Sequence, residues 1–119
     1  MKIWVDGSGA LFEWQVARIA VVFEDGKKII RNIGKKTNNE AEYSALLEAL
    51  YNPEAENSLI LTDSQLLVGQ LTKNWKINVK HLMPLNEEAK KLLDKKHCRI
   101  EWVRREENLA GKLLEKKPV

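Results

Sequence analysis

The alternation of apolar and polar positions near the start of the chain predicts β-structure. Ile3 and Val5 are separated by one residue, which is the period of a half-buried strand, and Gly7-Ser8-Gly9 is expected to end that strand. Asp25-Gly26 suits a hairpin turn because both residue types tolerate a positive φ. Two more strands are expected on either side of this turn, over residues 15–23 and 28–33. The first part of the chain therefore predicts an antiparallel meander of three strands.

The rest of the chain alternates between helical and strand patterns. Thr37-Asn38-Asn39-Glu40 has the form of a capping box and predicts a helix to about Tyr51, before Asn52-Pro53. The apolar run Leu59-Ile60-Leu61-Thr62 is typical of a strand buried on both faces, and Ser64 can cap the next helix. The remaining expected elements are a helix to about residue 71, a helix over 84–96, a strand over 98–103 and a helix over 107–117. Together they predict one α/β domain over residues 1–119, built on a single mixed sheet.

The composition fits an ordinary globular domain. The 119 residues are 44% hydrophobic and 31% charged, which argues against a disordered tail or a repeat array. No apolar run approaches the roughly 18 residues that span a bilayer, and Met1-Lys2-Ile3-Trp4 leads directly into a strand pattern. Cys98 is the single cysteine, which excludes an internal disulfide and a cysteine-based zinc site. We therefore expect a cytoplasmic monomer without a membrane partner.

The charge distribution adds a candidate nucleic-acid surface. The net charge is only +3, but no acidic residue occurs between Asp63 and Glu87. This stretch contains Trp75 among basic residues, namely Lys73, Lys76, Lys80 and His81. Short basic runs are commonly solvated loops with one hydrophobic anchor. The alternative is a groove that follows a phosphate backbone and offers an aromatic ring to a sugar or base.

Three acidic residues occupy positions where a carboxylate needs an explanation. Asp6 ends the first expected strand and Asp63 ends the buried one, so both would lie at one sheet edge if these strands are neighbours. Glu42 interrupts the apolar face of the helix that begins near residue 37. A buried carboxylate is costly unless it is paired or binds a metal. The plainer alternatives are a turn at Asp6, a helix cap at Asp63, and a salt bridge from Glu42 to a distant base such as Lys2.

Convergence of Asp6, Glu42 and Asp63 would create an all-oxygen site. Such hard ligands suit Mg²⁺ or Mn²⁺, whereas imidazole or thiolate ligands would favour zinc. Two such ions about 4 Å apart can activate a water and stabilise the leaving oxygen in phosphodiester hydrolysis. The basic stretch around Trp75 would then hold a nucleic-acid substrate.

Four motifs, in order, resemble those of type 1 ribonuclease H. They are Trp4-Val5-Asp6-Gly7-Ser8, Thr37-Asn38-Asn39-Glu40-Ala41-Glu42-Tyr43, Leu61-Thr62-Asp63-Ser64-Gln65 and Trp102-Val103-Arg104-Arg105-Glu106-Glu107-Asn108. The resemblance covers nearly the whole chain and implies the ribonuclease H-like fold, a five-stranded mixed sheet flanked by helices. It also implies Mg²⁺-dependent endonucleolytic hydrolysis of the RNA strand of an RNA/DNA hybrid, leaving 5′-phosphate and 3′-hydroxyl ends. In this resemblance Asp6, Glu42 and Asp63 match the catalytic carboxylates that bind metal.

The same resemblance implies which residues contact the nucleic acid. Asn38 and Asn39 match residues that read the minor groove, where 2′-hydroxyls and base edges are displayed, and Gln65 is a candidate to join them. The other matches concern the DNA strand: Thr37 with the nearby Lys35 at a phosphate, and Trp75 in the channel that the strand follows.

The chain departs from the family pattern at the start of the last helix. The family usually brings a fourth carboxylate from an Asn-x-x-Ala-Asp turn, but this chain reads Asn108-Leu109-Ala110-Gly111-Lys112. Alignment on the alanine puts Gly111 at the acidic position, and alignment on the asparagine puts Lys112 there. Glu107, Asn108 or a water is a candidate substitute for the missing ligand, and Lys112 could instead place a fixed charge near the site.

Two loops also differ from the family pattern. The loop after Asp6 reads Gly9-Ala10-Leu11-Phe12 where the family often has Gly-Asn-Pro-Gly, and the loop before the last helix lacks a histidine. The missing carboxylate keeps open a weakly active or inactive module that binds the hybrid. Because fold alone does not fix the substrate, a related nuclease acting on another target, such as double-stranded RNA or a DNA junction, is a further alternative.

Overall fold

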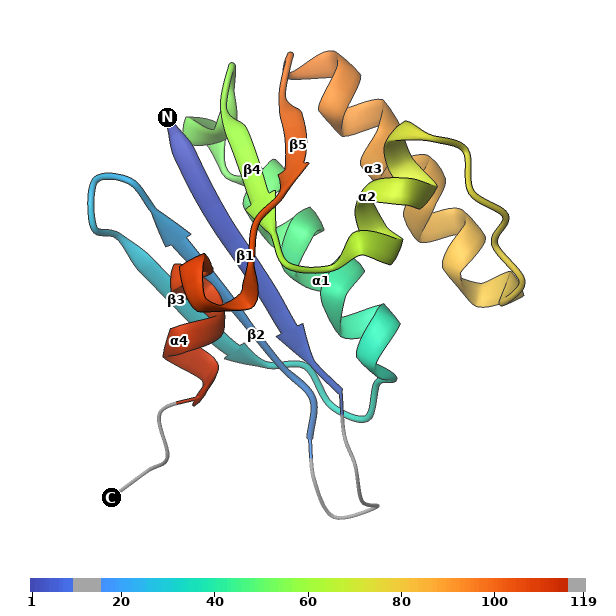
Figure 1. The fold of residues 1–119 in the computed structure, drawn as a ribbon, viewed down its shortest axis with the longest axis horizontal. Helices are drawn as coiled ribbons and strands as arrows, with labels where there is room; N and C mark the ends of the chain where they lie inside the picture. Colours follow the sequence, from blue (N-terminus) through green and yellow to red (C-terminus); the bar gives the residue numbers. More distant parts are fainter. Residues whose placement is uncertain (10–15, 116–119) are drawn as a thin grey trace.

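The computed structural model describes residues 1–9 and 16–115. Its five strands form one sheet in the order β3-β2-β1-β4-β5 (Figure 1). The strands are β1 (Lys2–Ser8), β2 (Arg18–Phe23), β3 (Lys28–Asn32), β4 (Leu59–Thr62) and β5 (Arg99–Trp102). The pairs β1–β2 and β2–β3 are antiparallel, whereas β4 is parallel to both β1 and β5. The expected meander and the expected mixed sheet are confirmed.

Helices cover both faces of this sheet. They are α1 (Asn38–Tyr51), α2 (Gln65–Thr72), α3 (Met83–Lys95) and α4 (Leu109–Glu115), with the short 3₁₀ turns η1 (Pro53–Ala55), η2 (Lys80–Leu82) and η3 (Arg105–Glu107). Alternate residues of β1 face opposite sides, as its period of two requires. Ile3 and Val5 belong to the main core with α1, α2 and α3, whereas Trp4 packs with Ala110 of α4. Helix α4 therefore covers the face opposite α1 (Figure 1).

The start of α1 is fixed by the expected capping box. Thr37 Oγ1 accepts a hydrogen bond from the Glu40 amide at 3.2 Å, and Glu40 Oε1 accepts one from the Thr37 amide at 3.1 Å. His81 Nε2 of η2 lies 3.6 Å from Glu40 Oε1. The first turn of α1, which carries several of the expected site residues, is therefore held from two directions.

Strand β1 continues two residues beyond its expected end. Gly7 and Ser8 still pair with β2, so the expected strand break at this point is wrong. A Cβ at Gly7 would collide with the carbonyl group of Ala41. The glycine therefore permits close packing of β1 against α1 instead of forming a turn. As a consequence Asp6 lies inside β1, close to its carboxyl end, and not at a turn.

The other boundaries agree with the expected ones to within a few residues. Helix α4 begins at Leu109 because the residues before it form η3 and Asn108 caps the helix with its side chain. The expected strand start at residue 15, the expected helix end at residue 117 and most of the loop Gly9-Ala10-Leu11-Phe12 lie outside the described residues. Within residues 1–9 and 16–115, no helix has the length and apolar character needed to cross a membrane.

Candidate active site

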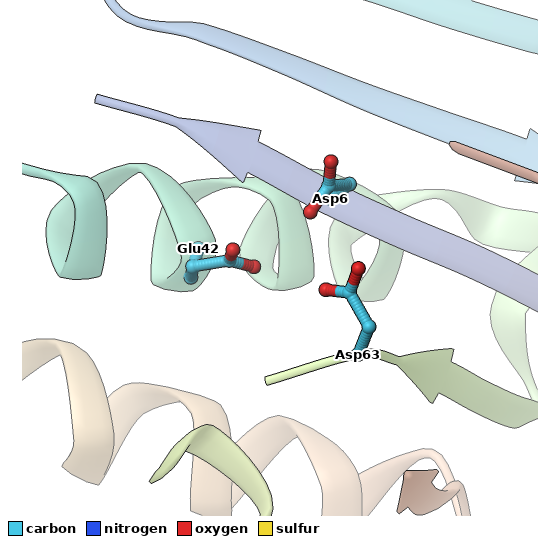
Figure 2. Close-up of side chains that lie close together, drawn as sticks. All are labelled: Asp6, Glu42 and Asp63. Carbon is cyan, nitrogen blue, oxygen red and sulfur yellow. The ribbon is translucent and has the colours of Figure 1, made fainter. Parts of the chain in front are cut away.

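Three carboxylates converge at one edge of the sheet (Figure 2). Asp6 belongs to β1, Asp63 directly follows β4, and Glu42 belongs to α1. Because β1 and β4 are parallel neighbours, their carboxyl ends reach the same edge, and α1 packs across β1. One carboxylate oxygen of each residue lies within 4.8 Å of the other two. The expected convergence of Asp6, Glu42 and Asp63 is confirmed.

Glu42 is the most deeply buried of the three. The residue is only 7% exposed, and its Oε2 has no hydrogen-bond partner among the described residues. None of the ion pairs within the described ranges includes Glu42, so the alternative of a salt bridge to a base such as Lys2 is not found there. A buried polar atom without a partner costs free energy. This cost favours a ligand at Glu42 Oε2.

The proximity of these carboxylates disfavours their charged forms. Burial, and then the charge of Asp63, raises the pKa of Asp6 from 3.8 to about 7. Burial, and then the charges of Asp6 and Asp63, raises the pKa of Glu42 from 4.5 to about 9. The guanidinium of Arg105 partly opposes the rise in the pKa of Asp6. In the absence of a cation the cluster therefore holds protons near neutral pH, and a divalent cation would displace them.

The three side chains line a polar cavity of about 380 Å³. The remaining wall comes from the end of β1, the start of α1, the residue after Asp63, η3 and α4: Gly7, Ser8, Asn38, Ser64, Arg105, Gly111, Leu114 and Glu115. Arg105 Nε donates a hydrogen bond to Glu115 Oε1 at 3.2 Å across this wall. The cavity therefore combines an acidic floor with one cationic side chain, an arrangement that suits a metal-bound phosphate.

Helix α4 reaches the carboxylates at position 111. Asn108 is fully buried, its Nδ2 donates to the Val5 carbonyl at 3.0 Å, and its Oδ1 accepts from amides in the first turn of α4. These bonds hold the start of α4 against β1. A Cβ at Gly111 would lie 3.3 Å from Asp6 Oδ2. Of the two alignments, the geometry favours Gly111 as the position of the missing carboxylate, since Lys112 is exposed and outside the cavity wall.

The residues expected to contact nucleic acid are divided between several places. Asn38 lines the carboxylate cavity, and its Oδ1 accepts a hydrogen bond from the Gly9 amide at 3.2 Å. Asn39 is half-buried and lies near Glu42 in a crevice too narrow to admit water. Thr37 and Lys35 are exposed on the segment that leads into α1, and the structure does not bring them into the carboxylate cavity.

Gln65 and Trp75 share a second pocket, of about 300 Å³, beside α2. Val68, Gly69, Lys73 and Trp102 complete its lining. Trp75 is 45% exposed, and its ring packs so closely on Gly69 that a Cβ there would collide with it. Lys73 Nζ lies 5.8 Å from the Trp75 ring centroid. The basic stretch therefore holds a fixed, accessible aromatic ring next to a cation, which favours the groove over a merely solvated loop.

Several residues of these two pockets carry no role in the sequence-based prediction. Trp102 lines the second pocket, and its Nε1 donates to the Asp63 carbonyl at 3.2 Å, which connects this pocket to the carboxylates. Arg105 belongs to the fourth motif and lies three residues after β5, at the start of η3. Ser8 belongs to the first motif, whereas Glu115 lies in no motif and its placement depends on the orientation of α4.

A larger cavity of about 750 Å³ lies elsewhere, between α3 and β5. It shares no lining residue with the carboxylate cavity. Among the described residues, only Asp6, Glu42 and Asp63 bring three potential metal ligands together. Size alone therefore does not identify the site, and the chemistry of the smaller cavity does.

Comparison with known proteins agrees with this geometry. The family model for RNase H matches residues 1–111. The chain belongs to the RNase H family. RNase H1 from the halophilic archaeon Halobacterium salinarum NRC-1 has a TM-score of 0.79 and 30% identity, over 95% of this chain and 92% of that chain. LC11-RNase H1, solved in complex with an RNA/DNA hybrid, has a TM-score of 0.80 and 26% identity, over 94% of this chain and 91% of that chain.

A longer relative contains a domain of the same kind. The bifunctional protein Rv2228c of Mycobacterium tuberculosis is 35% identical over 80 residues, which are 64% of this chain but 22% of that protein. The N-terminal RNase H domain of Rv2228c, solved as a fusion with maltose binding protein, has a TM-score of 0.75 and 28% identity, over 90% of this chain and 84% of that chain. By family and fold, this chain is a member of the RNase H family with a five-stranded mixed sheet like that of the RNase H1 structures.

Proposed function

We propose that this RNase H is a divalent-metal-dependent endonuclease that hydrolyses the RNA strand of RNA/DNA hybrids. The observation that carries the proposal is the meeting of Asp6, Glu42 and Asp63, whose ligand atoms lie within 4.8 Å of one another. The partnerless Glu42 Oε2 and the raised pKa values of Asp6 and Glu42 support a cation at this site, because a cation would pair with that oxygen and favour the deprotonated carboxylates. The donor set is all oxygen, which suits Mg²⁺ or Mn²⁺.

The carboxylates would hold the metal, and the surrounding wall would orient the substrate. When bound, two such ions supply an activated water for in-line attack and neutralise charge on the leaving oxygen. Asp6 and Asp63 are fixed by neighbouring strands and Glu42 by α1, so their positions require little rearrangement on binding. Arg105 places a positive charge at the same cavity, where a substrate phosphate would lie.

Recognition of the hybrid would extend along α1 and α2. Asn38, Asn39 and Gln65 carry amide groups that can both donate to and accept from 2′-hydroxyls and base edges. Trp75 would pack against the DNA strand, with Lys35 and Thr37 at one of its phosphates. The capping role of Thr37 is compatible with this contact, because Oγ1 accepts the Glu40 amide and its own proton can still be donated. The hybrid complex of LC11-RNase H1 supports this choice of substrate class.

The decisive experiment replaces one metal ligand without changing its shape. Asp63→Asn should lower the rate of hydrolysis of a labelled RNA/DNA hybrid by about 10³-fold. Hybrid affinity and the free energy of unfolding should change little, because Asp63 is partly exposed and lies after β4. Asp94→Asn, an exposed acid on α3, is the matched control and should keep full activity. An Asp63→Asn variant as active as the parent chain would refute the proposal.

The bare backbone at Gly111 favours one competing function. Without a side chain beside Asp6 Oδ2, the chain could bind hybrids and cleave them slowly or not at all. If one molecule of purified protein cleaves many hybrid molecules, this binding-only function is eliminated. Rates on RNA/DNA hybrid and on double-stranded RNA, compared at one salt concentration, would separate the remaining substrate classes.

A further inference from the structure

Helix α4 presents an acidic side chain to the cavity one turn beyond Gly111. Residues four apart lie on the same face of a helix, so Glu115 follows Gly111 along the wall that α4 forms. Both residues line the cavity together with Asp6, Glu42 and Asp63. Because Gly111 has no side chain, nothing from that position fills the space between Glu115 and the carboxylate cluster. We infer that Glu115 supplies a fourth carboxylate to the metal site; this inference rests on the proposed function.

The other candidates near the start of α4 do not reach the cavity in this way. Asn108 is fully buried, and both ends of its amide are used, toward Val5 and toward the first turn of α4. Glu107 and Lys112 are exposed and do not belong to the cavity wall. Among the described residues, Glu115 is therefore the one further carboxylate that lines the site.

A need for such a ligand follows from the chemistry of the three deeper residues. Mg²⁺ and Mn²⁺ favour about six oxygen ligands, and three carboxylates leave several positions for water, substrate or another side chain. Glu42 is 7% exposed, and its Oε2 has no hydrogen-bond partner among the described residues, which independently supports a cation in this cavity. A fourth negative charge at the rim would strengthen that binding.

The ion pair between Glu115 and Arg105 is weak enough to leave the Glu115 carboxylate available to a metal ion. The two side chains are 78% and 55% exposed, and ion pairs in such solvent contact are weak. A metal ion in the cavity would therefore compete successfully for the Glu115 carboxylate. Release of Arg105 from this pair would free its guanidinium for a substrate phosphate.

Calorimetric titration of the full chain with Mn²⁺ alone tests the inference without measuring activity. Glu115→Gln should weaken Mn²⁺ affinity about tenfold, since it removes one charged ligand. Glu107→Gln removes an exposed acid of the same segment and should bind Mn²⁺ like the parent chain. Arg105→Gln should bind Mn²⁺ at least as tightly as the parent, whereas loss of affinity in both Arg105→Gln and Glu115→Gln would mean that the ion pair matters and not the ligand.

A second-site variant gives a positive test. Gly111→Asp brings a carboxylate beside Asp6, whose Oδ2 must move only slightly because the added Cβ would lie 3.3 Å away. In the Glu115→Gln background this change should restore Mn²⁺ affinity. Unchanged affinity in Glu115→Gln, or an equal loss in Glu107→Gln, would overturn the inference. If Asp63→Asn also left the isotherm unchanged, the cavity would not be the metal site and the proposed function would fall as well.

Discussion

Two adjacent residues of α1, Glu42 and Tyr43, show how this chain treats buried polar groups in opposite ways. Both are buried, at 7% and 1% exposure. The Tyr43 hydroxyl donates to Gln70 Oε1 at 2.7 Å and accepts from Asn86 Nδ2 at 3.0 Å. Glu42 Oε2 has no partner among the described residues. The hydrogen-bonding capacity of the Tyr43 hydroxyl is satisfied within the protein, whereas Glu42 Oε2 needs a partner from outside the described residues.

This difference in hydrogen bonding distinguishes a structural group, Tyr43, from a candidate functional group, Glu42. The Tyr43 network links α1, α2 and α3, so its hydrogen bonds specify how three helices pack. The carboxylate cluster links β1, β4 and α1, yet it places like charges together in a partly buried cavity. A group that only stabilised the fold would not be left in that condition. Variants of the two regions should therefore change stability in opposite directions, and only variants of the carboxylate cluster should lose activity.

The largest effect is expected from Glu42→Gln. Loss of this ligand should lower hydrolysis of an RNA/DNA hybrid by about 10³-fold, while the free energy of unfolding without metal at pH 8 should rise by about 2 kcal/mol. The gain arises because glutamine has no pKa to be raised by burial and by Asp6. Single-turnover kinetics and urea unfolding in a metal chelator measure the two quantities. A variant that loses both activity and stability would place Glu42 with the structural residues instead.

A smaller and opposite effect is expected from Asn86→Ala. The change removes the donor to the Tyr43 hydroxyl and to the Gln70 carbonyl, so the free energy of unfolding should fall by about 2 kcal/mol. Activity per folded molecule should remain within about twofold of the parent, because no atom of Asn86 lines the carboxylate cavity. Glu87→Ala, at the neighbouring exposed position, is the control and should change neither quantity. A tenfold loss of activity would show that the network also positions the catalytic residues.

The two regions also differ in how far the sequence could predict them. Glu42 was predicted as buried because helical periodicity alone places it on the apolar face, and the capping box fixed where that helix begins. The convergence of Asp6 and Asp63 also requires β1 and β4 to be neighbours. The order of the motifs, through the family resemblance, predicts this, but the spacing of the residues alone does not. Tyr43 met its partners on two other helices, and no local pattern states how helices pack against one another.

The errors near the site have similar causes. The strand break expected at Gly7 ignored that glycine also permits close approach of two backbones, which here are β1 and α1. No local pattern places Glu115 in the cavity, because its position depends on the hydrogen bond from Asn108 to the Val5 carbonyl, a contact between the two ends of the chain. Local propensities are therefore sufficient to predict the helices and strands. Contacts between distant parts of the chain determine which residues line the carboxylate cavity.

The pH dependence of stability has a sign that distinguishes this cluster from ordinary surface carboxylates. The pKa values of Asp6 and Glu42 rise from 3.8 and 4.5 to about 7 and about 9 in the folded chain. Between these limits the folded state binds more protons than the unfolded state, so the stabilisation present below about pH 4 is lost as pH rises through the folded values. Without metal, the free energy of unfolding should fall by about 1 kcal/mol per pH unit for each proton involved.

Urea unfolding at pH 6, 7 and 8 with a chelator present measures this slope. In Glu42→Gln the slope should be shallower, because one of the two titrating groups is absent. Saturating Mg²⁺ should also reduce the slope in the parent chain, since a bound cation favours the deprotonated carboxylates and stabilises the folded state more at higher pH. Asn86→Ala should keep the parent slope at a lower overall stability, because it does not alter the carboxylates. If the stability of the parent chain without metal rises from pH 6 to pH 8, the pKa values of Asp6 and Glu42 are not raised in the folded state, and the cluster is not the electrostatically unfavourable site described above.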